Sequence, residues 1–252
     1  MRMKFVKTEN YVRFTQAALA VEQRGAAEAG MMLVYGLPGN GKSYVVTNWA
    51  TKVGALYLRA NVDWTPRYFL MELAKVAGIE PYGTSRDLFA VLRDRLAGSL
   101  TPLVIDEAEF TLPNNAAVLE KIRDFSDRSE MTVVLVGMER IRSKVARYQQ
   151  IFSRIAQVVE FKPASPVDVG HVCDELAEIE MTQALKLEVH RLSGGRMREV
   201  LNIIATIERI AETNGFNRVD VAQLEGTVLS YNWETCSPRS VRRSARSTAG
   251  AH

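Results

Sequence analysis

The chain has 252 residues, of which 47% are hydrophobic and 24% charged, the composition of an ordinary soluble globular protein with one large or two small domains. No apolar run reaches about 18 residues and no apolar segment follows Met1–Phe5, so the sequence predicts neither a membrane span nor a signal peptide. Cys173 and Cys236 lack metal-type spacing and the three histidines form no ligand pattern. Reduced thiols in the cytoplasm are therefore expected.

The net charge of +3 is distributed unevenly along the chain. Four arginines and no acidic residue lie between Ser237 and His252, which leaves the rest of the chain close to neutral. This segment is too polar to form a core, and we expect a disordered basic tail over residues 233–252. Such a tail either touches nucleic acid or is simply solvated.

Taken in chain order, the hydrophobic pattern first predicts a helix over residues 11–29 that ends near Gly30. Strand and helix patterns then alternate, which predicts an α/β fold with a parallel sheet covered by helices. The expected strands are Met31–Tyr35, Ala55–Arg59, Leu103–Ile105, Thr132–Val136 and Gln157–Phe161. The expected helices are Ser43–Lys52, Pro66–Ala77, Ser85–Gly98, Asn115–Ser129 and Arg140–Gln150.

The alternation stops at Pro163 and Pro166, and only helical periodicity follows. The expected helices there are Val167–Glu180, Ala184–Leu192, Met197–Asn214 and Val219–Tyr231. We therefore expect an N-terminal helix or arm (1–30), a nucleotide-binding domain (31–162), a small all-helical domain (163–232) and the tail (233–252).

The segment Gly36–Ser43 fits the pattern of a phosphate-binding P-loop, G-x-x-x-x-G-K-[ST]. A strand pattern precedes it and a helix pattern follows it, as such a loop requires. The glycines allow a tight turn whose amides cradle phosphate at a helix N-terminus, while Lys42 reaches the β- and γ-phosphates and Ser43 binds Mg²⁺. The expected ATP-binding residues of the loop are Gly36, Pro38, Gly39, Asn40, Gly41, Lys42, Ser43 and Tyr44.

The strand pattern Leu103–Ile105 ends in two acidic residues, about 65 residues after the P-loop, and resembles a Walker B motif. Asp106 is expected to hold Mg²⁺ directly or through water. Glu107 is expected to orient and deprotonate the attacking water. The alternative is a solvated acidic loop at the end of a strand.

The P-loop, the Asp-Glu pair and the helical C-terminal part together resemble the AAA+ ATPases over roughly residues 30–230. The resemblance implies a five-stranded parallel αβα domain with a helical lid, and two arginine roles. Arg198 matches the sensor 2 arginine that reaches the γ-phosphate, with Arg196 as the other register. Arg154 matches an arginine finger that completes a neighbouring subunit's site, with Arg147 as the alternative. For both, a surface salt bridge is the structural alternative.

One position departs from the AAA+ pattern. Sensor 1 is usually a polar residue at the end of the fourth strand, but this strand runs through Val136 into Gly137 and Met138. Neither residue can orient a water with its side chain, and Glu139 is the nearest substitute. We therefore expect slow intrinsic hydrolysis that increases on assembly.

Within the AAA+ proteins, the segments Val62–Leu70 and Val134–Glu139 resemble the transposition ATPases of the phage Mu B and TniB/TnsC type. This resemblance implies ATP-dependent, sequence-independent binding to double-stranded DNA. The protein would assemble there as a helical filament or ring and recruit or stimulate a transposase.

Phosphate contacts in such an assembly require a few basic and polar side chains. The loop after the second strand and the segment after Asp106 are the candidate DNA-facing edges. The candidate residues are Trp64, Thr65, Arg67 and Lys121. Alternatively, Thr65 and Pro66 simply begin the next helix, as N-cap and first helical residue.

Other functions fit the same motifs. One is an AAA+ replication initiator or helicase loader, although few residues follow Tyr231. Another is a secretion-associated ATPase of the ExeA type. A third is a nucleotide-dependent switch that barely hydrolyses ATP, which the unusual sensor 1 keeps open.

Overall fold

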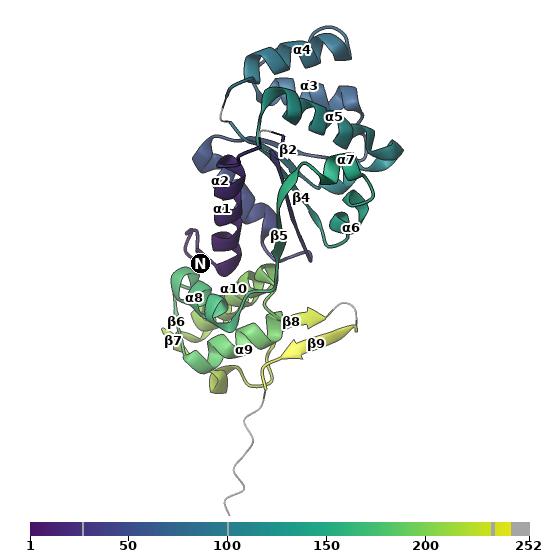
Figure 1. The fold of residues 1–252 in the computed structure, drawn as a ribbon. Helices are drawn as coiled ribbons and strands as arrows, with labels where there is room; N and C mark the ends of the chain where they lie inside the picture. Colours follow the sequence, from purple (N-terminus) through teal and green to yellow (C-terminus); the bar gives the residue numbers. More distant parts are fainter. Residues whose placement is uncertain (27, 100, 233–234, 243–252) are drawn as a thin grey trace, which may run out of the picture. The chain divides into compact units, whose positions relative to one another are not determined.

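The computed structural model describes residues 1–26, 28–99, 101–232 and 235–242. The chain divides into two compact units: Asn10–Lys162, and Met1–Glu9 together with the residues from Pro163 onward (Figure 1). The expected N-terminal arm of residues 1–30 is therefore not a separate part of the structure. Its first nine residues pack in the C-terminal unit, where Val6 is in the core, and the remainder belongs to the nucleotide-binding unit.

The first unit is built on a five-stranded sheet in the order β2-β3-β4-β1-β5, with every neighbouring pair parallel. The strands are β1 (Met31–Gly36), β2 (Leu56–Arg59), β3 (Leu103–Asp106), β4 (Val133–Met138) and β5 (Ile155–Phe161). The predicted α/β fold with a five-stranded parallel sheet is confirmed. Because all strands are parallel, the carboxyl ends of β1, β3 and β4 lie at the same edge of the sheet, where ligands of open α/β sheets bind.

Alternating side chains of the central strands face two helical layers. One face contributes Met31, Leu33, Ile105 and Leu135 to a core shared with α3 (Pro66–Val76), α4 (Ser85–Leu96) and α5 (Pro113–Ser129). On the other side lie α1 (Glu9–Glu22) and α2 (Lys42–Val53), which run beside each other (Figure 1). There Phe14 packs edge-on against Trp49, with ring centroids 5.3 Å apart.

Two features of this unit differ from the sequence prediction. The first helix ends at Glu22, not near residue 29, because Gln23, Arg24 and Gly25 follow it and offer no apolar side chain to the core. The expected helix Arg140–Gln150 is wrong, since the chain forms two short helices, α6 (Ile141–Val145) and α7 (Gln149–Phe152). Ile141, Val145 and Ile151 are all buried, and the non-helical turn Ala146–Tyr148 separates the two helices.

The C-terminal unit contains α8 (Pro166–Leu176), α9 (Gln183–Ser193) and α10 (Met197–Asn214), which bury a common apolar core. The helical character of this part is confirmed. It also carries short strands: β6 (Glu180–Met181) pairs with β7 (Arg218–Val219), and β8 (Val228–Asn232) pairs antiparallel with β9 (Ser237–Ser240).

These strands correct two expectations. The segment Val219–Tyr231 is not a helix but a 3-10 turn (Val221–Leu224) followed by β8. Residues 235–242 of the expected disordered tail are ordered, since Ser237–Ser240 forms β9 and Val241 is buried. Residues 233–234 and 243–252 of that tail lie outside the described residues. Within the described part of the chain, no helix combines the length and apolarity needed to cross a membrane.

Candidate nucleotide-binding site

The loop Gly36–Ser43 joins β1 to α2 and turns through left-handed backbone at Gly39 and Gly41, with φ of 85° and 84°. Side chains other than glycine are strained in this conformation. Gly36 is required for a different reason. A Cβ there would lie 2.4 Å from the carbonyl oxygen of Phe161, the last residue of β5, so only glycine allows this approach.

Two buried side chains hold the loop in place. The Asn40 amide donates to the carbonyl oxygen of Phe161 at 2.8 Å, which ties the loop to the edge strand. The Lys42 ammonium donates to the carbonyl oxygens of Gly36 at 2.8 Å and Leu37 at 3.0 Å. The loop therefore wraps around a positive charge, the arrangement that favours a bound phosphate.

The next two predicted loop residues are exposed. Ser43 lies in the first turn of α2 and Tyr44 follows it with 58% of its surface exposed. Ser43 is four residues before Thr47, so the two share a helix face. Thr47 hydrogen-bonds the hydroxyl of Tyr57, which in turn contacts Asp106. Ser43 thus stands on the α2 face that is turned toward the end of β3.

Asp106 is buried at the end of β3, with both carboxylate oxygens in use. Its Oδ2 accepts a hydrogen bond from the Tyr57 hydroxyl at 2.7 Å, and its Oδ1 accepts from the Glu107 amide at 2.9 Å. Burial raises the pKa of Tyr57 above its usual value, so the phenol stays protonated and donates. The carboxylate is thereby fixed in orientation.

The donor chemistry fits a magnesium nucleotide. A serine hydroxyl and a carboxylate are hard oxygen donors of the kind that Mg²⁺ prefers, and Mg²⁺ in such sites also takes oxygens from substrate phosphates. The glycine loop and Lys42 supply the amides and charge that phosphates need. Ser43 and Asp106 are therefore the residues that would hold the ion.

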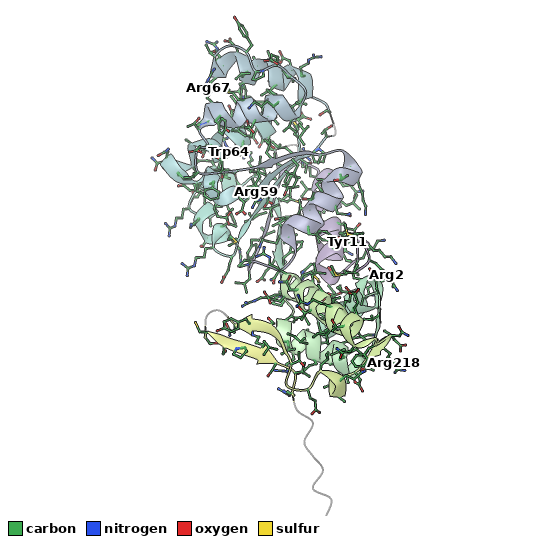
Figure 2. All side chains as sticks on the ribbon, turned by 180° about the vertical axis from the view of Figure 1, so that it is seen from behind. Arg2, Tyr11, Arg59, Trp64, Arg67 and Arg218 are labelled. Atoms are coloured by element: carbon green, nitrogen blue, oxygen red, sulfur yellow. The ribbon has the colours of Figure 1, made fainter. Side chains whose placement is uncertain are left out.

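Glu107 has a left-handed backbone with φ of 55°, which is uncommon for a residue with a side chain. Its Oε1 forms an ion pair with Nη2 of Arg59 at 3.0 Å, from the neighbouring strand β2. The Arg59 side chain is 70% exposed (Figure 2). The carboxylate expected to act as a base is thus engaged by an exposed cation.

This ion pair predicts a gain of activity on its removal. Arg59→Ala should raise basal ATP turnover by about twofold to fivefold, because it frees the Glu107 carboxylate while an exposed pair adds little stability. Steady-state ATPase assays and thermal melting measure the two effects. Lower turnover would mean that Arg59 orients Glu107 productively, and unchanged turnover would mean that the ion pair does not restrain Glu107.

The expected arginine finger has partners within its own unit. Arg154 lies just before β5, and its Nε donates to both oxygens of Asp127 on α5 at 3.1 Å. A weaker ion pair joins its Nη2 to Glu28 at 3.8 Å. The alternative residue, Arg147, is exposed between α6 and α7. The finger role of Arg154 stays a prediction, and it requires exchange of these partners.

Arg198 lies in the first turn of α10 in the C-terminal unit and is exposed. Arg196, the other register, is the N-cap of the same helix and is half-buried. The preceding Gly195 has φ of 72°, and its carbonyl accepts from the Ala164 amide at 2.8 Å. A Cβ at Gly195 would lie 2.4 Å from the carbonyl oxygen of Ala164, so this turn requires glycine.

The candidate DNA contacts fall into different environments (Figure 2). Trp64 is wrong as a DNA contact, because it is only 6% exposed and packs against Phe69 with ring centroids 5.7 Å apart. The Thr65 hydroxyl accepts from the Tyr68 amide at 3.1 Å and caps α3, with Pro66 as its first residue. The capping alternative therefore describes the structural role of Thr65.

The two basic candidates remain at the surface. Arg67 is exposed and its Nη1 donates to the carbonyl oxygen of Gly83 at 2.9 Å. The Lys121 ammonium lies 4.8 Å from the ring centroid of Phe89 and 4.0 Å from Asp124. Arg67 can turn toward a phosphate by giving up one hydrogen bond, whereas Lys121 is held between α4 and α5.

Sequence reasoning missed three side chains that border the site: Tyr57, Arg59 and Glu109. Tyr57 and Arg59 are two residues apart on β2 and therefore share one face of the strand. Two polar side chains on one face could have suggested a contact with the acidic end of a neighbouring strand. Glu109 lies two residues after Glu107 and has no sequence signal of its own.

Fold and loop together define a P-loop nucleotide-binding domain. Residues 24–145 match the family model AAA_22, described as an AAA domain. This stretch, just under half of the chain, is therefore similar to an AAA domain, in line with the resemblance to AAA+ proteins.

Two curated proteins are similar in sequence. A potential ATP-binding protein of Staphylococcus aureus is 26% identical over 117 residues, 42% of this chain and 43% of that protein. Replication factor C subunit 3 of Schizosaccharomyces pombe is 24% identical over 209 residues, 78% of this chain and 54% of that protein. The chain thus spans about half the length of these relatives or less.

Solved AAA+ structures share the fold over most of the chain. Cdc6p of Pyrobaculum aerophilum gives a TM-score of 0.62 at 16% identity, covering 88% of this chain and 68% of that one. The ORC1 protein of Aeropyrum pernix, solved in complex with DNA, gives a TM-score of 0.58 at 20% identity, covering 85% of this chain and 63% of that one. These similarities establish the fold; the transposition branch stays a prediction.

Proposed function

We propose that the chain is an ATP-hydrolysing AAA+ protein that binds double-stranded DNA as an oligomer, in the manner of replication initiators and helicase loaders. The observation that carries the proposal is the ordered phosphate loop in a chain that shares its fold with a DNA-bound ORC1 protein over 85% of its length. Among the functions considered from the sequence, the comparisons favour this one over transposition.

The nucleotide part of the proposal rests on the ends of β1 and β3. Lys42 and the loop amides would bind the phosphates, Ser43 and Asp106 would hold Mg²⁺, and Glu107 would accept the proton of the attacking water. Mg²⁺ held there would neutralise charge on the phosphates. Tyr57 keeps Asp106 oriented, since its hydroxyl lies 2.7 Å from the carboxylate.

The oligomeric part rests on the two arginines. Arg198 would contact the γ-phosphate and Arg154 would act across a subunit boundary, where it stabilises charge in the transition state. Because Arg154 would come from a neighbouring subunit, hydrolysis would be slow in the dilute protein and turnover would rise with protein concentration.

A second candidate is transposition target selection, in which the protein recruits or stimulates a transposase. It rests on the resemblance of Val62–Leu70 and Val134–Glu139 to the transposition ATPases. Electron microscopy of the protein with ATP on random-sequence duplex DNA separates the candidates. Continuous filaments favour transposition, whereas discrete complexes favour an initiator.

Arg67 gives a prediction for the DNA surface. Arg67→Ala should weaken binding to duplex DNA equally for all sequences and reduce the slope of log affinity against log salt by about one. The matched control is Arg218→Ala, an exposed arginine of β7 that pairs with Glu180 (Figure 2). Titrations monitored by fluorescence anisotropy measure both; equal losses for the two variants would remove Arg67 from the DNA surface.

A further inference from the structure

The carboxyl end of β4 lies between β3, which carries Asp106, and β1, which leads into the phosphate loop. A polar side chain at this end would stand beside the nucleotide phosphates. The strand instead ends in Gly137 and Met138, and Glu139 beyond it is exposed. No residue of β4 therefore provides such a group.

A carboxylate from elsewhere fills this place. Glu109 lies in the 3-10 turn Ala108–Thr111 after β3, and its Oε1 accepts a hydrogen bond from the Met138 amide. A Cβ at position 137 would lie 2.9 Å from Oε1 of Glu109 and 2.6 Å from Cδ1 of Ile141. Glycine at position 137 therefore leaves the space that the Glu109 carboxylate occupies.

The second oxygen of Glu109 is left for another partner. Its Oε2 is buried and has no hydrogen-bond partner within the described part of the chain. A buried polar atom without a partner is costly, and such atoms in native proteins call for an explanation. Glu109 borders a hollow of about 350 Å³ that also includes Pro38 of the phosphate loop. The full lining is Pro38, Glu109, Met138, Glu139, Arg140, Ile141 and Lys144.

We propose that Glu109 takes the role of the polar residue that β4 lacks and is a positioning residue for ATP hydrolysis. Its Oε1 fixes the backbone at Met138, and its Oε2 accepts a hydrogen bond that forms when ATP and water occupy the site. The inference rests on the ATPase part of the proposed function and is independent of DNA. It assigns the contact with the γ-phosphate end of ATP to the 3-10 turn Ala108–Thr111 rather than to Glu139.

Single substitutions test whether Glu109 positions the reacting groups in ATP hydrolysis. Glu109→Ala should lower ATP turnover by about tenfold to a hundredfold, since a small misplacement of reacting groups costs that much. It should also reduce the preference for ATP over ADP, measured with fluorescent nucleotides. Glu109→Gln keeps an acceptor for the Met138 amide but replaces Oε2 by an NH2 group that cannot accept, so it should melt like the original protein and still lower turnover. Gly137→Ser should impair turnover, because its Cβ meets the carboxylate.

A double substitution separates positioning from simple structural support. In Glu109→Ala/Gly137→Ser the serine side chain enters the space vacated by the carboxylate and places a polar group directly on β4, while the end of the Ile141 side chain, 2.6 Å from the new Cβ, turns into the same vacated space. Turnover and ATP preference should then exceed those of Glu109→Ala alone. Melting temperatures of all variants control for loss of folding.

The outcomes are distinct. A double variant no better than Glu109→Ala, or an Ala variant with unchanged turnover and unchanged ATP preference, overturns the proposal. If the original protein binds nucleotide but fails to bind DNA, the proposed function is wrong. The role of Glu109 is then decided by the preference for ATP over ADP alone. If turnover is too slow to measure, the ratio of ATP to ADP affinity decides it.

Discussion

Glu107→Gln is expected to lower ATP turnover by about two to four orders of magnitude while leaving ATP affinity nearly unchanged. The amide keeps the size of the side chain and removes the basic oxygen that accepts a proton from water. The substitution also weakens the ion pair with Arg59, but that pair is exposed and contributes little to folding. The ATP-bound assembly should therefore accumulate.

Paired measurements make this result interpretable. Single-turnover hydrolysis and equilibrium binding of a fluorescent ATP separate chemistry from affinity. Glu80→Gln, an exposed acid after α3, is the matched control and should behave like the original protein. If Glu107→Gln loses ATP binding as well, Glu107 supports the loop structurally and another group acts as the base.

Trp64→Ala is expected to have the largest effect on stability, a loss of about 3–5 kcal/mol in the free energy of unfolding. The indole is 6% exposed and packs against Phe69 beneath the start of α3. Its removal leaves a cavity in the core of α3, α4 and α5. Chemical denaturation measures the loss, and Trp64→Phe should recover part of it.

The same variant distinguishes a core residue from a DNA contact. At a temperature where Trp64→Ala is still folded, its affinity for duplex DNA should equal that of the original protein. A variant of normal stability with weakened DNA binding would contradict the buried position and restore Trp64 as a contact.

Much of the nucleotide-binding unit could be predicted from the sequence, because its signals are local. The apolar runs of β1, β3 and β4 are buried on both faces and are recognisable without tertiary context. The phosphate loop is likewise a contiguous motif with matching flanks. The helical C-terminal part followed from a change in hydrophobic period after Pro163.

Other features depend on contacts that are distant in sequence. The Tyr57 hydroxyl meets Asp106 across 49 positions, and Glu109 meets Met138 across 29. Neither pairing leaves a pattern along the chain. Trp64 was misplaced because its motif places it in a loop, whereas the fold buries that loop against α3. The strands β8 and β9 were missed because their pairing, not their composition, orders them.

ATP is expected to control the binding of the protein to double-stranded DNA. The most direct test is the fluorescence anisotropy of a labelled random-sequence duplex, titrated with the full chain in ATP, ADP or a slowly hydrolysed analogue. We expect tight, salt-sensitive binding with ATP and the analogue, at least about tenfold weaker binding with ADP, and loss of the difference in Lys42→Ala. Equal affinity in all nucleotide states, or no binding at any salt concentration, would contradict the claim.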